Sequence, residues 1–256
     1  MIIEHPKDQN TFITVLGTLI SIVMVGITSA IIAVVALASA IVWGDFQAWK
    51  SHGTGGTPST IQGYIKIRKW GIYLLSQNQN LLDVSKIPNE GPAYLDPSSI
   101  SQRAGSRPKL TRWTLPQRQH KTPITPQALS TLTSLMQRLS SASPYSSYIN
   151  TAPSKTEGGT GTAIYVNKDV GTINPNAHKI FYEVAHVHPS ENSLHAYLSP
   201  RDARVVIEKG WALRFPVDWI APASWVMVFA PRNGSEVEVV EEIVKAAVQF
   251  AVGKRL

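Results

Sequence analysis

The sequence predicts an α+β fold in which one N-terminal transmembrane helix precedes a domain of helices packed on a mainly antiparallel sheet. Three observations predict it: a long apolar opening segment, an order of helix, strands, helix, strand and helix in the C-terminal half, and a central hairpin pattern. We expect a short tail at 1–10, a transmembrane helix at 11–44, a juxtamembrane segment and extended arm at 45–124, and the α+β domain at 125–256.

The opening segment is apolar enough to cross a bilayer. Residues 11–44 contain no charged side chain. About 20 apolar helical residues cross the hydrocarbon core, so this segment spans it with residues to spare for tilt. A cleaved signal peptide is the competing interpretation, but the run is much longer than a typical signal and only Lys7 precedes it as a basic residue. We expect a single-pass anchor that binds the chain to the membrane.

Basic residues beside the span indicate its orientation. Four of them follow it, at Lys50, Lys66, Arg68 and Lys69. The positive-inside rule then places the C-terminal domain in the cytosol, on the endoplasmic reticulum or another endomembrane. Residues 65–75 mix aliphatic, basic and aromatic side chains. They form either an interfacial segment at the headgroups or a helix packed on the domain.

Composition excludes several classes of function. The chain has no cysteine, which excludes disulfides and thiolate catalysis. Its net charge of +7 is spread along the chain without a basic helix or a recognisable binding motif, so we expect no nucleic-acid partner. The sequence also has no Gly-x-Ser-x-Gly elbow, phosphate-binding loop or dinucleotide-binding glycine pattern.

The first part of the domain begins with an arm and a helix. Residues 78–125 are rich in Pro, Ser and Gln, but they contain too many aromatic and apolar residues for pure disorder. Thr125 is a typical N-cap and Pro126 a typical first helical residue, so a helix begins there. A Gly- and Thr-rich loop at 151–162 then leads into a β-prone segment at 163–166.

The last part of the domain alternates helices with a strand. Ser199 is an N-cap for a helix that runs to about Lys209 and stops at Gly210. Residues 225–230 form a near-continuous apolar strand. After a turn, the final helix runs from Glu236 to about Val252 with an apolar stripe.

The central hairpin carries three of the chain's seven histidines. Residues 181–188 and 193–198 are predicted strands, and Pro189–Asn192 supplies four turn-forming residues. If the strands pair across this turn, His186 faces His195 and His188 faces Ser193. Opposed β-carbons lie roughly 5 Å apart, so the register predicts a tight imidazole cluster.

This register has consequences for both faces of the first strand. On a regular strand Tyr182, Val184, His186 and His188 share one face, and Glu183 points to the other. Histidines two residues apart are also common as half-exposed polar residues on a strand. A one-residue slip would send His195 to the opposite face and remove the cluster.

Several motifs occur together along most of the chain after the span. They are Glu183–His188, Ser193–His195, Asp202, Glu208–Trp211, Ala230–Asn233, Arg103–Pro108, Gln117–Gln119 and Gly63–Tyr64. With the N-terminal hydrophobic helix, this set resembles fungal luciferase and its luciferase-like relatives.

The resemblance implies an oxygenase. Fungal luciferases are membrane-associated and oxidise 3-hydroxyhispidin, a styryl-pyrone enol, with molecular oxygen as co-substrate and no organic cofactor. The reaction runs through a high-energy peroxide that loses carbon dioxide and leaves an excited emitter. The partner implied for this chain is therefore a small aromatic or pyrone molecule. Luciferase-like relatives also occur where no light is made, so the resemblance implies less than light emission.

Such chemistry assigns roles to the residues of the hairpin. Oxygenation without a cofactor needs an enolate, because an electron-rich anion passes an electron to oxygen more easily than a neutral enol does. Imidazole, with a pKa of about 6.5, is the natural base. We expect His186 or His195 to be that base, and His188, the other histidine and Arg214 to stabilise the enolate and peroxide oxygens.

Four further residues are candidates for binding the substrate: Trp211, Tyr197, Arg107 and Arg118. Trp211 also fits a core residue after a helix-ending glycine. Arg103, Arg107 and Arg118 also fit solvated or salt-bridged residues of the arm.

One departure bears on activity. The chain has Arg214-Phe215-Pro216 where the luciferases continue to Arg-His-Pro, and its following loop, 217–224, is shorter. This departure supports one alternative, a non-catalytic membrane-tethered domain that binds a small molecule.

The other alternative is a metal-dependent enzyme with three imidazole ligands, His186, His188 and His195. Glu183 and Glu191 are the neighbouring carboxylates that could join such a site. Glu183 is the poorer candidate, because a regular strand would turn it away.

Overall fold

The structure is a computed structural model that describes residues 7–112 and 115–256. The chain forms two compact units, Met1–Ala48 and Trp49–Leu256. Helix α1 (Lys7–Ser51) makes up the described part of the first unit and enters the second. Its residues Thr11–Ser51 are long and apolar enough to cross a membrane by length and composition. The predicted span at 11–44 is the charge-free part of this helix. Of the expected tail at 1–10, residues 1–6 lie outside the described residues and 7–10 are helical.

The second unit is built on a six-stranded sheet in the order β1-β2-β3-β4-β6-β5. Every neighbouring pair is antiparallel, which confirms the predicted α+β class. The strands are β1 (Ile149–Pro153), β2 (Thr162–Val166), β3 (Glu183–Val187), β4 (Leu194–Tyr197), β5 (Ala212–Arg214) and β6 (Trp225–Val228). The sequence did not predict β1 or β5, because both are short and lack clear alternation.

Four further helices begin at side-chain caps. They are α2 (Ile61–Ser76), α3 (Pro126–Ser141), α4 (Pro200–Glu208) and α5 (Gly234–Val252). Thr60, Thr125, Ser199 and Asn233 each accept a hydrogen bond from a backbone N–H of the following first turn. These bonds satisfy donors that a helix leaves unpaired at its N-terminus. The predicted starts of α3, α4 and α5 agree with the structure to within two residues.

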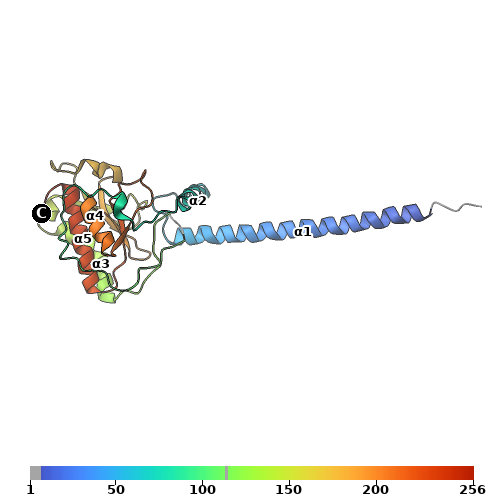
Figure 1. Ribbon diagram of the computed structural model, residues 1–256, viewed down its shortest axis with the longest axis horizontal. Helices are drawn as coiled ribbons and strands as arrows, with labels where there is room; N and C mark the ends of the chain where they lie inside the picture. The colour runs from blue at the N-terminus through green and yellow to red at the C-terminus, as the bar shows by residue number, and fades with distance from the viewer. Residues whose placement is uncertain (1–6, 113–114) are drawn as a thin grey trace, which may run out of the picture. The chain divides into compact units, whose positions relative to one another are not determined.

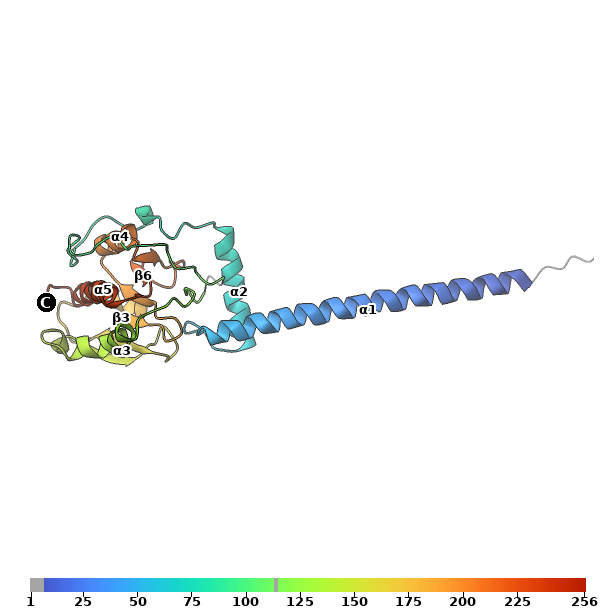
Figure 2. The same ribbon diagram turned by 90° about the horizontal axis from the view of Figure 1, so that it is seen from below.

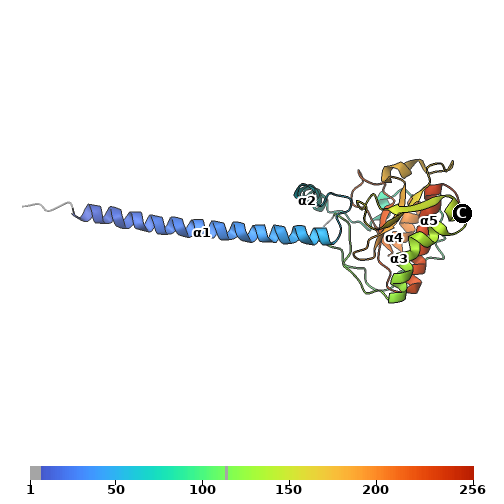
Figure 3. The same cartoon turned by 180° about the vertical axis from the view of Figure 1, so that it is seen from behind.

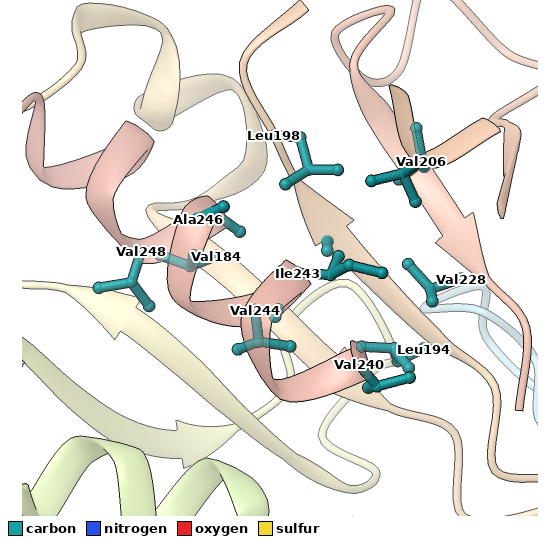
Figure 4. Packing of buried hydrophobic residues seen from close by; sticks show 14 of the residues in the cluster. Val184, Leu194, Leu198, Val206, Val228, Val240, Ile243, Val244, Ala246 and Val248 are labelled. Atoms are coloured by element: carbon teal, nitrogen blue, oxygen red, sulfur yellow. The ribbon is translucent and has the colours of Figure 1, made fainter. Parts of the chain in front are cut away.

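Helices α3 and α5 lie side by side against one face of the sheet (Figures 1 and 3). Figure 4 shows Val240, Ile243 and Val244 of α5 packed among Leu194 of β4 and Val228 of β6. Each such aliphatic side chain contributes about 1.5–3 kcal/mol when fully buried. Since strand residues alternate between faces, this core turns His195 to the opposite face of the sheet.

The arm between α2 and α3 is packed on the domain. A short 3₁₀ helix of the arm, η1 (Val84–Lys86), contacts α4 (Figure 2). There Arg204 of α4 donates hydrogen bonds to the backbone oxygens of Val84 and Ile87. Further along, Asp202 accepts hydrogen bonds from the backbone N–H groups of Tyr94 and Leu95 at 2.9 and 3.3 Å. The arm therefore contributes both core residues and, beyond them, residues of the site.

Candidate functional site

A cavity lies on the face of the sheet that α3 and α5 leave uncovered, and His186 and His195 line it. Most of its wall is apolar or aromatic, with Ile67, Trp70, Leu115, Phe181, Phe215 and Trp225. Its polar lining includes Gln117 and Arg118 of the arm, Thr156 and Glu157 of the β1–β2 loop, and His186 and His195 of the hairpin. Thr54, Thr57 and Lys179 also line it. Apolar walls with a few convergent polar groups are typical of small-molecule sites. We call this space the histidine cavity.

The predicted hairpin register is confirmed. His186 pairs with His195, and the backbone N–H of His188 donates to the Ser193 carbonyl at 2.8 Å. The ring centroids of His186, His188 and His195 lie 5.0–5.4 Å apart, and all three side chains are buried. These residues form the imidazole cluster. They are not the half-exposed polar residues of the alternative interpretation.

The first strand of the hairpin departs from regularity at its start. Ile164 of β2 pairs with Ala185, but the next residue, Tyr165, pairs with Glu183, so Val184 is an extra residue in β3. This is a β-bulge. Both Val184 and Ala185 therefore pack in the main core, and Glu183 turns to the side of His186. The predictions that Val184 shares a face with His186 and that Glu183 points away are wrong, because they assume a regular strand.

Two carboxylates flank His186. Its Nδ1 lies 2.6 Å from Glu183 Oε1, and its Nε2 lies 3.4 Å from Glu157 Oε1. Glu183 also accepts hydrogen bonds from the hydroxyls of Ser154, Thr156 and Tyr165. These bonds fix the carboxylate, so the imidazole between the two acids is held on both of its nitrogens.

His188 is held at both ring nitrogens as well. Its Nδ1 lies 3.0 Å from Glu191 Oε1 and 2.8 Å from Ser193 Oγ. Its Nε2 lies 3.1 Å from a guanidinium nitrogen of Arg118 and 3.2 Å from His186 Nε2. Since Arg118 only donates, neutral His188 accepts that hydrogen bond at Nε2.

Arg118 joins the arm to the cluster. Its guanidinium is buried and forms an ion pair with Glu157. A second carboxylate oxygen, Glu191 Oε1, lies 3.9 Å from its Nε. This places a permanent positive charge beside the histidines.

His195 lies between the other two histidines and the aromatic wall. Its Nδ1 is 3.2 Å from the Val226 carbonyl oxygen, which can only accept, so the neutral ring carries its proton on Nδ1 and a lone pair on Nε2. Trp225 stacks on the ring at 5.4 Å, and Phe215 meets it edge-on at 5.5 Å. The position at which the chain departs from the luciferase pattern is therefore in direct contact with His195.

The charge of His186 follows from its neighbours. Burial lowers the pKa of His186, but hydrogen bonds to Glu157 and Glu183 outweigh burial and raise that pKa above its ordinary value. Burial likewise raises the pKa of each carboxyl. The charge of Arg118 nevertheless holds the pKa of Glu157 at about 2, and the hydrogen bond to His186 holds that of Glu183 at about 2. The two carboxylates therefore favour the imidazolium form of His186.

The other two imidazoles are neutral. Burial, then the charges of His186 and Arg118, lower the pKa of His195 to about 3. Burial and Arg118 lower the pKa of His188 well below its ordinary value. Burial also raises the pKa of the Glu191 carboxyl to about 7. The cluster thus separates a charged ring, His186, from a neutral one with a free lone pair, His195.

Four of the predicted residues lie away from the histidine cavity. Arg214 donates to the Asn80 carbonyl oxygen at 3.0 Å, and Trp211 packs in the main core with its Nε1 donating to Ser101 O at 2.7 Å. Tyr197 is buried against Phe250, with ring centroids 4.9 Å apart. Arg107 is exposed on the arm. The buried cation beside the histidines is Arg118, not Arg214.

Sequence reasoning missed three polar residues of the site. Glu157 and Thr156 lie in a loop whose pattern predicts only a turn. Glu183 was assigned to the wrong face because of the bulge. Glu191, which the sequence offered as a neighbouring carboxylate, lies in the hairpin turn, where it accepts hydrogen bonds from the N–H and hydroxyl of Ser193.

The chain is similar to fungal luciferases over most of its length. It is 24% identical to a luciferase of Neonothopanus nambi over 241 residues, which cover 88% of this chain and 87% of that one. It is 27% identical to a luciferase of Armillaria ostoyae over 242 residues, 88% of each chain. A luciferase of Armillaria mellea is 26% identical over 219 residues, 80% of each chain.

The matched domain coincides with the hairpin and its surroundings. Residues 182–247 match the Luciferase domain family, and they include the imidazole cluster and most of α5. No solved structure matches the chain. The matched domain and the curated relatives agree in showing that this chain is similar to fungal luciferases.

Proposed function

We propose that the protein is a membrane-anchored oxygenase that oxidises a hydroxy-pyrone enol of the 3-hydroxyhispidin type with molecular oxygen. The observation that carries the proposal is the pairing of a neutral His195, with its lone pair on Nε2, and a charged His186 in one apolar cavity. One ring accepts a proton and the other stabilises an anion. An enol substrate requires both.

Two buried cations favour an anionic substrate. The Arg118 guanidinium and the His186 imidazolium belong to the same hydrogen-bonded group, and both residues line the histidine cavity. An enolate oxygen in this low-dielectric space gains more from them than it would in water. The cations therefore lower the pKa of the bound enol and keep the enolate in place.

The reaction begins with a proton transfer. The enol O–H gives its proton to His195 Nε2, which leaves an enolate. Because the pKa of His195 is low, this transfer depends on the two cations that stabilise the enolate. The enolate carbon passes an electron to oxygen and then bonds to it, which forms a peroxide. The proton on His195 returns to the peroxide oxygen, so the ring ends neutral. Oxygen is the only oxidant, and no organic cofactor takes part. Loss of carbon dioxide from the peroxide supplies the energy for light where the emitter is fluorescent.

One lining residue is suited to a substrate hydroxyl. Gln117 lines the histidine cavity, and its Nε2 donates to the Arg214 carbonyl oxygen at 2.8 Å. Its Oε1 is buried and has no hydrogen-bond partner among the described residues. A buried acceptor of this kind gains a partner when a hydroxyl donor binds. A phenol or pyrone hydroxyl meets that need.

The proposed location follows from the first helix. The apolar segment 11–44 anchors the chain, and the second unit lies in the cytosol as the flanking basic residues favour. A sparingly soluble aromatic substrate and an anchored enzyme then share the same membrane. The proposal includes no nucleic-acid partner.

The direct test supplies 3-hydroxyhispidin to the purified full-length protein and measures oxygen uptake, product mass and photons. We expect substrate-dependent oxygen uptake. His195→Gln removes the proton acceptor and lowers kcat roughly 10²-fold or more with little change in KM. His178→Gln, at an exposed histidine outside the cavity, is the matched control and keeps full activity. If folded wild-type protein consumes neither substrate nor oxygen, the non-catalytic binding domain replaces this proposal.

Phe215→His tests the departure from the luciferase pattern. The new imidazole would face His195 and add a hydrogen-bond donor for the peroxide oxygen. We expect the rate of oxygen uptake or light emission to rise at least about tenfold, because one donor to a developing oxyanion contributes that much or more. Phe215→Leu, which cannot donate a hydrogen bond, is the control. Equal rates for the two variants would show that this position does not serve the oxygenation.

One observation favours a second candidate, a metal-dependent enzyme. A ring nitrogen of each of His186, His188 and His195 lies within 4.8 Å of the others. Each Nδ1 is held from behind by a carboxylate or a carbonyl, as in many metal-binding histidines. Arg118 argues against this candidate, because its positive charge lies 3.1 Å from His188 Nε2.

Metal analysis separates the two candidates. We expect purified, folded protein to contain no stoichiometric zinc, iron or manganese and to keep its oxygen uptake after treatment with a chelator. A stoichiometric ion that is lost in His188→Ala and retained in His178→Ala would establish the metal enzyme instead.

A further inference from the structure

Helix α2 is apolar on two sides. Tyr64, Ile67 and Leu74 are buried against the domain. A second row is exposed and comprises Ile61 at 47%, Ile65 at 46%, Ile72 at 70% and Leu75 at 69%. Steps of four, seven and three residues place the second row on one stripe of the helix. Packing on the domain explains the buried apolar side of α2, but it does not explain the exposed one.

A loop distant in sequence adds apolar groups on a neighbouring side of α2. Trp219, which is 51% exposed, contacts Trp70 and Tyr73 with ring centroids 6.2 and 5.9 Å apart. The neighbouring Ile220 is exposed as well. We call Ile61, Ile65, Ile72, Tyr73, Leu75, Trp219 and Ile220 the outer face. Exposed apolar groups gathered from two segments mark an interaction surface.

The charges beside the outer face identify its partner. Residues 46–82 contain no Asp or Glu, and α2 carries Lys66, Arg68 and Lys69. Lys66 Nζ lies 4.7 Å from the Trp70 ring, so its aliphatic stem follows the aromatic surface. Aliphatic residues flanked by Lys, Trp and Tyr match the headgroup region of an anionic bilayer.

The chain also keeps α2 close to the bilayer that would hold α1. Only residues 52–60 separate the two helices, which limits their separation to about 30 Å. Within the second unit, Trp49 is buried and its ring contacts that of Tyr64 in α2 at 5.8 Å. Figures 1 and 2 show α2 apart from the layer formed by α3, α4 and α5.

We infer that the outer face lies in the headgroup region of an anionic bilayer. This inference depends on the proposed anchor and is independent of the oxygenase reaction. It also bears on substrate entry, because Ile67, Trp70 and Ile220 line the histidine cavity as well. An aromatic substrate dissolved in the bilayer would then meet the cavity wall at the membrane surface.

The absence of cysteine from the chain allows a precise test. Ile72→Cys in the full-length protein is labelled with an environment-sensitive fluorophore and reconstituted into vesicles that contain phosphatidylserine and brominated lipid. We expect blue-shifted emission and quenching at position 72. Glu238→Cys, an exposed position on α5, is the matched control and should show neither change.

The result that overturns the inference is equal emission and quenching at positions 72 and 238. Ala30→Cys, within α1, reports on the anchor. Quenching at 30 without quenching at 72 removes the inference alone, whereas no quenching at either position removes the anchor with it.

We also expect quenching at 72 to fall when phosphatidylserine is omitted or when Lys66 and Lys69 are changed to Gln. Quenching that is unaffected by both changes would contradict an anionic surface.

Discussion

The contact between Glu183 and His186 is the interaction on which the site depends. A one-residue bulge at Val184 brings this carboxylate to the face of the imidazole cluster, and three hydroxyls hold it there. Burial alone would leave His186 neutral like the other two rings, and Glu157 at Nε2 and Glu183 at Nδ1 together oppose it. The bulge therefore supplies one of the two carboxylates that favour the charged form of His186. A local irregularity of the backbone sets the electrostatics of the cavity.

The division of charge explains how one small cluster can serve two purposes. A general base must be neutral, whereas a group that stabilises an enolate or peroxide must be positive. His195 and His186 meet these needs within 5.4 Å of each other because their second nitrogens face different partners, a backbone carbonyl and a carboxylate. Arg118 adds a second positive charge, and its ion pair with Glu157 holds it against the cluster.

The fold and the register could be predicted from the sequence because both follow from local patterns. Caps at Thr125 and Ser199, and a four-residue turn between two β-prone segments, were enough to place His186 opposite His195. The bulge could not be predicted, since it depends on how β2 pairs with β3. The cation was also assigned to the wrong residue. Arg214 lies nearer to the hairpin in sequence, but the packed arm brings Arg118 to His188 across 70 residues.

The measurement that tests this account most directly is the protonation state of the histidine rings. Long-range ¹H–¹⁵N spectra of ¹⁵N-histidine-labelled protein distinguish the charged ring from each neutral tautomer, and Asn variants of each histidine assign the signals. At about pH 7 we predict that His186 is protonated on both nitrogens and that His195 is neutral with its proton on Nδ1. A neutral His186, or a His195 that becomes charged near its ordinary pKa of about 6.5, would contradict the account.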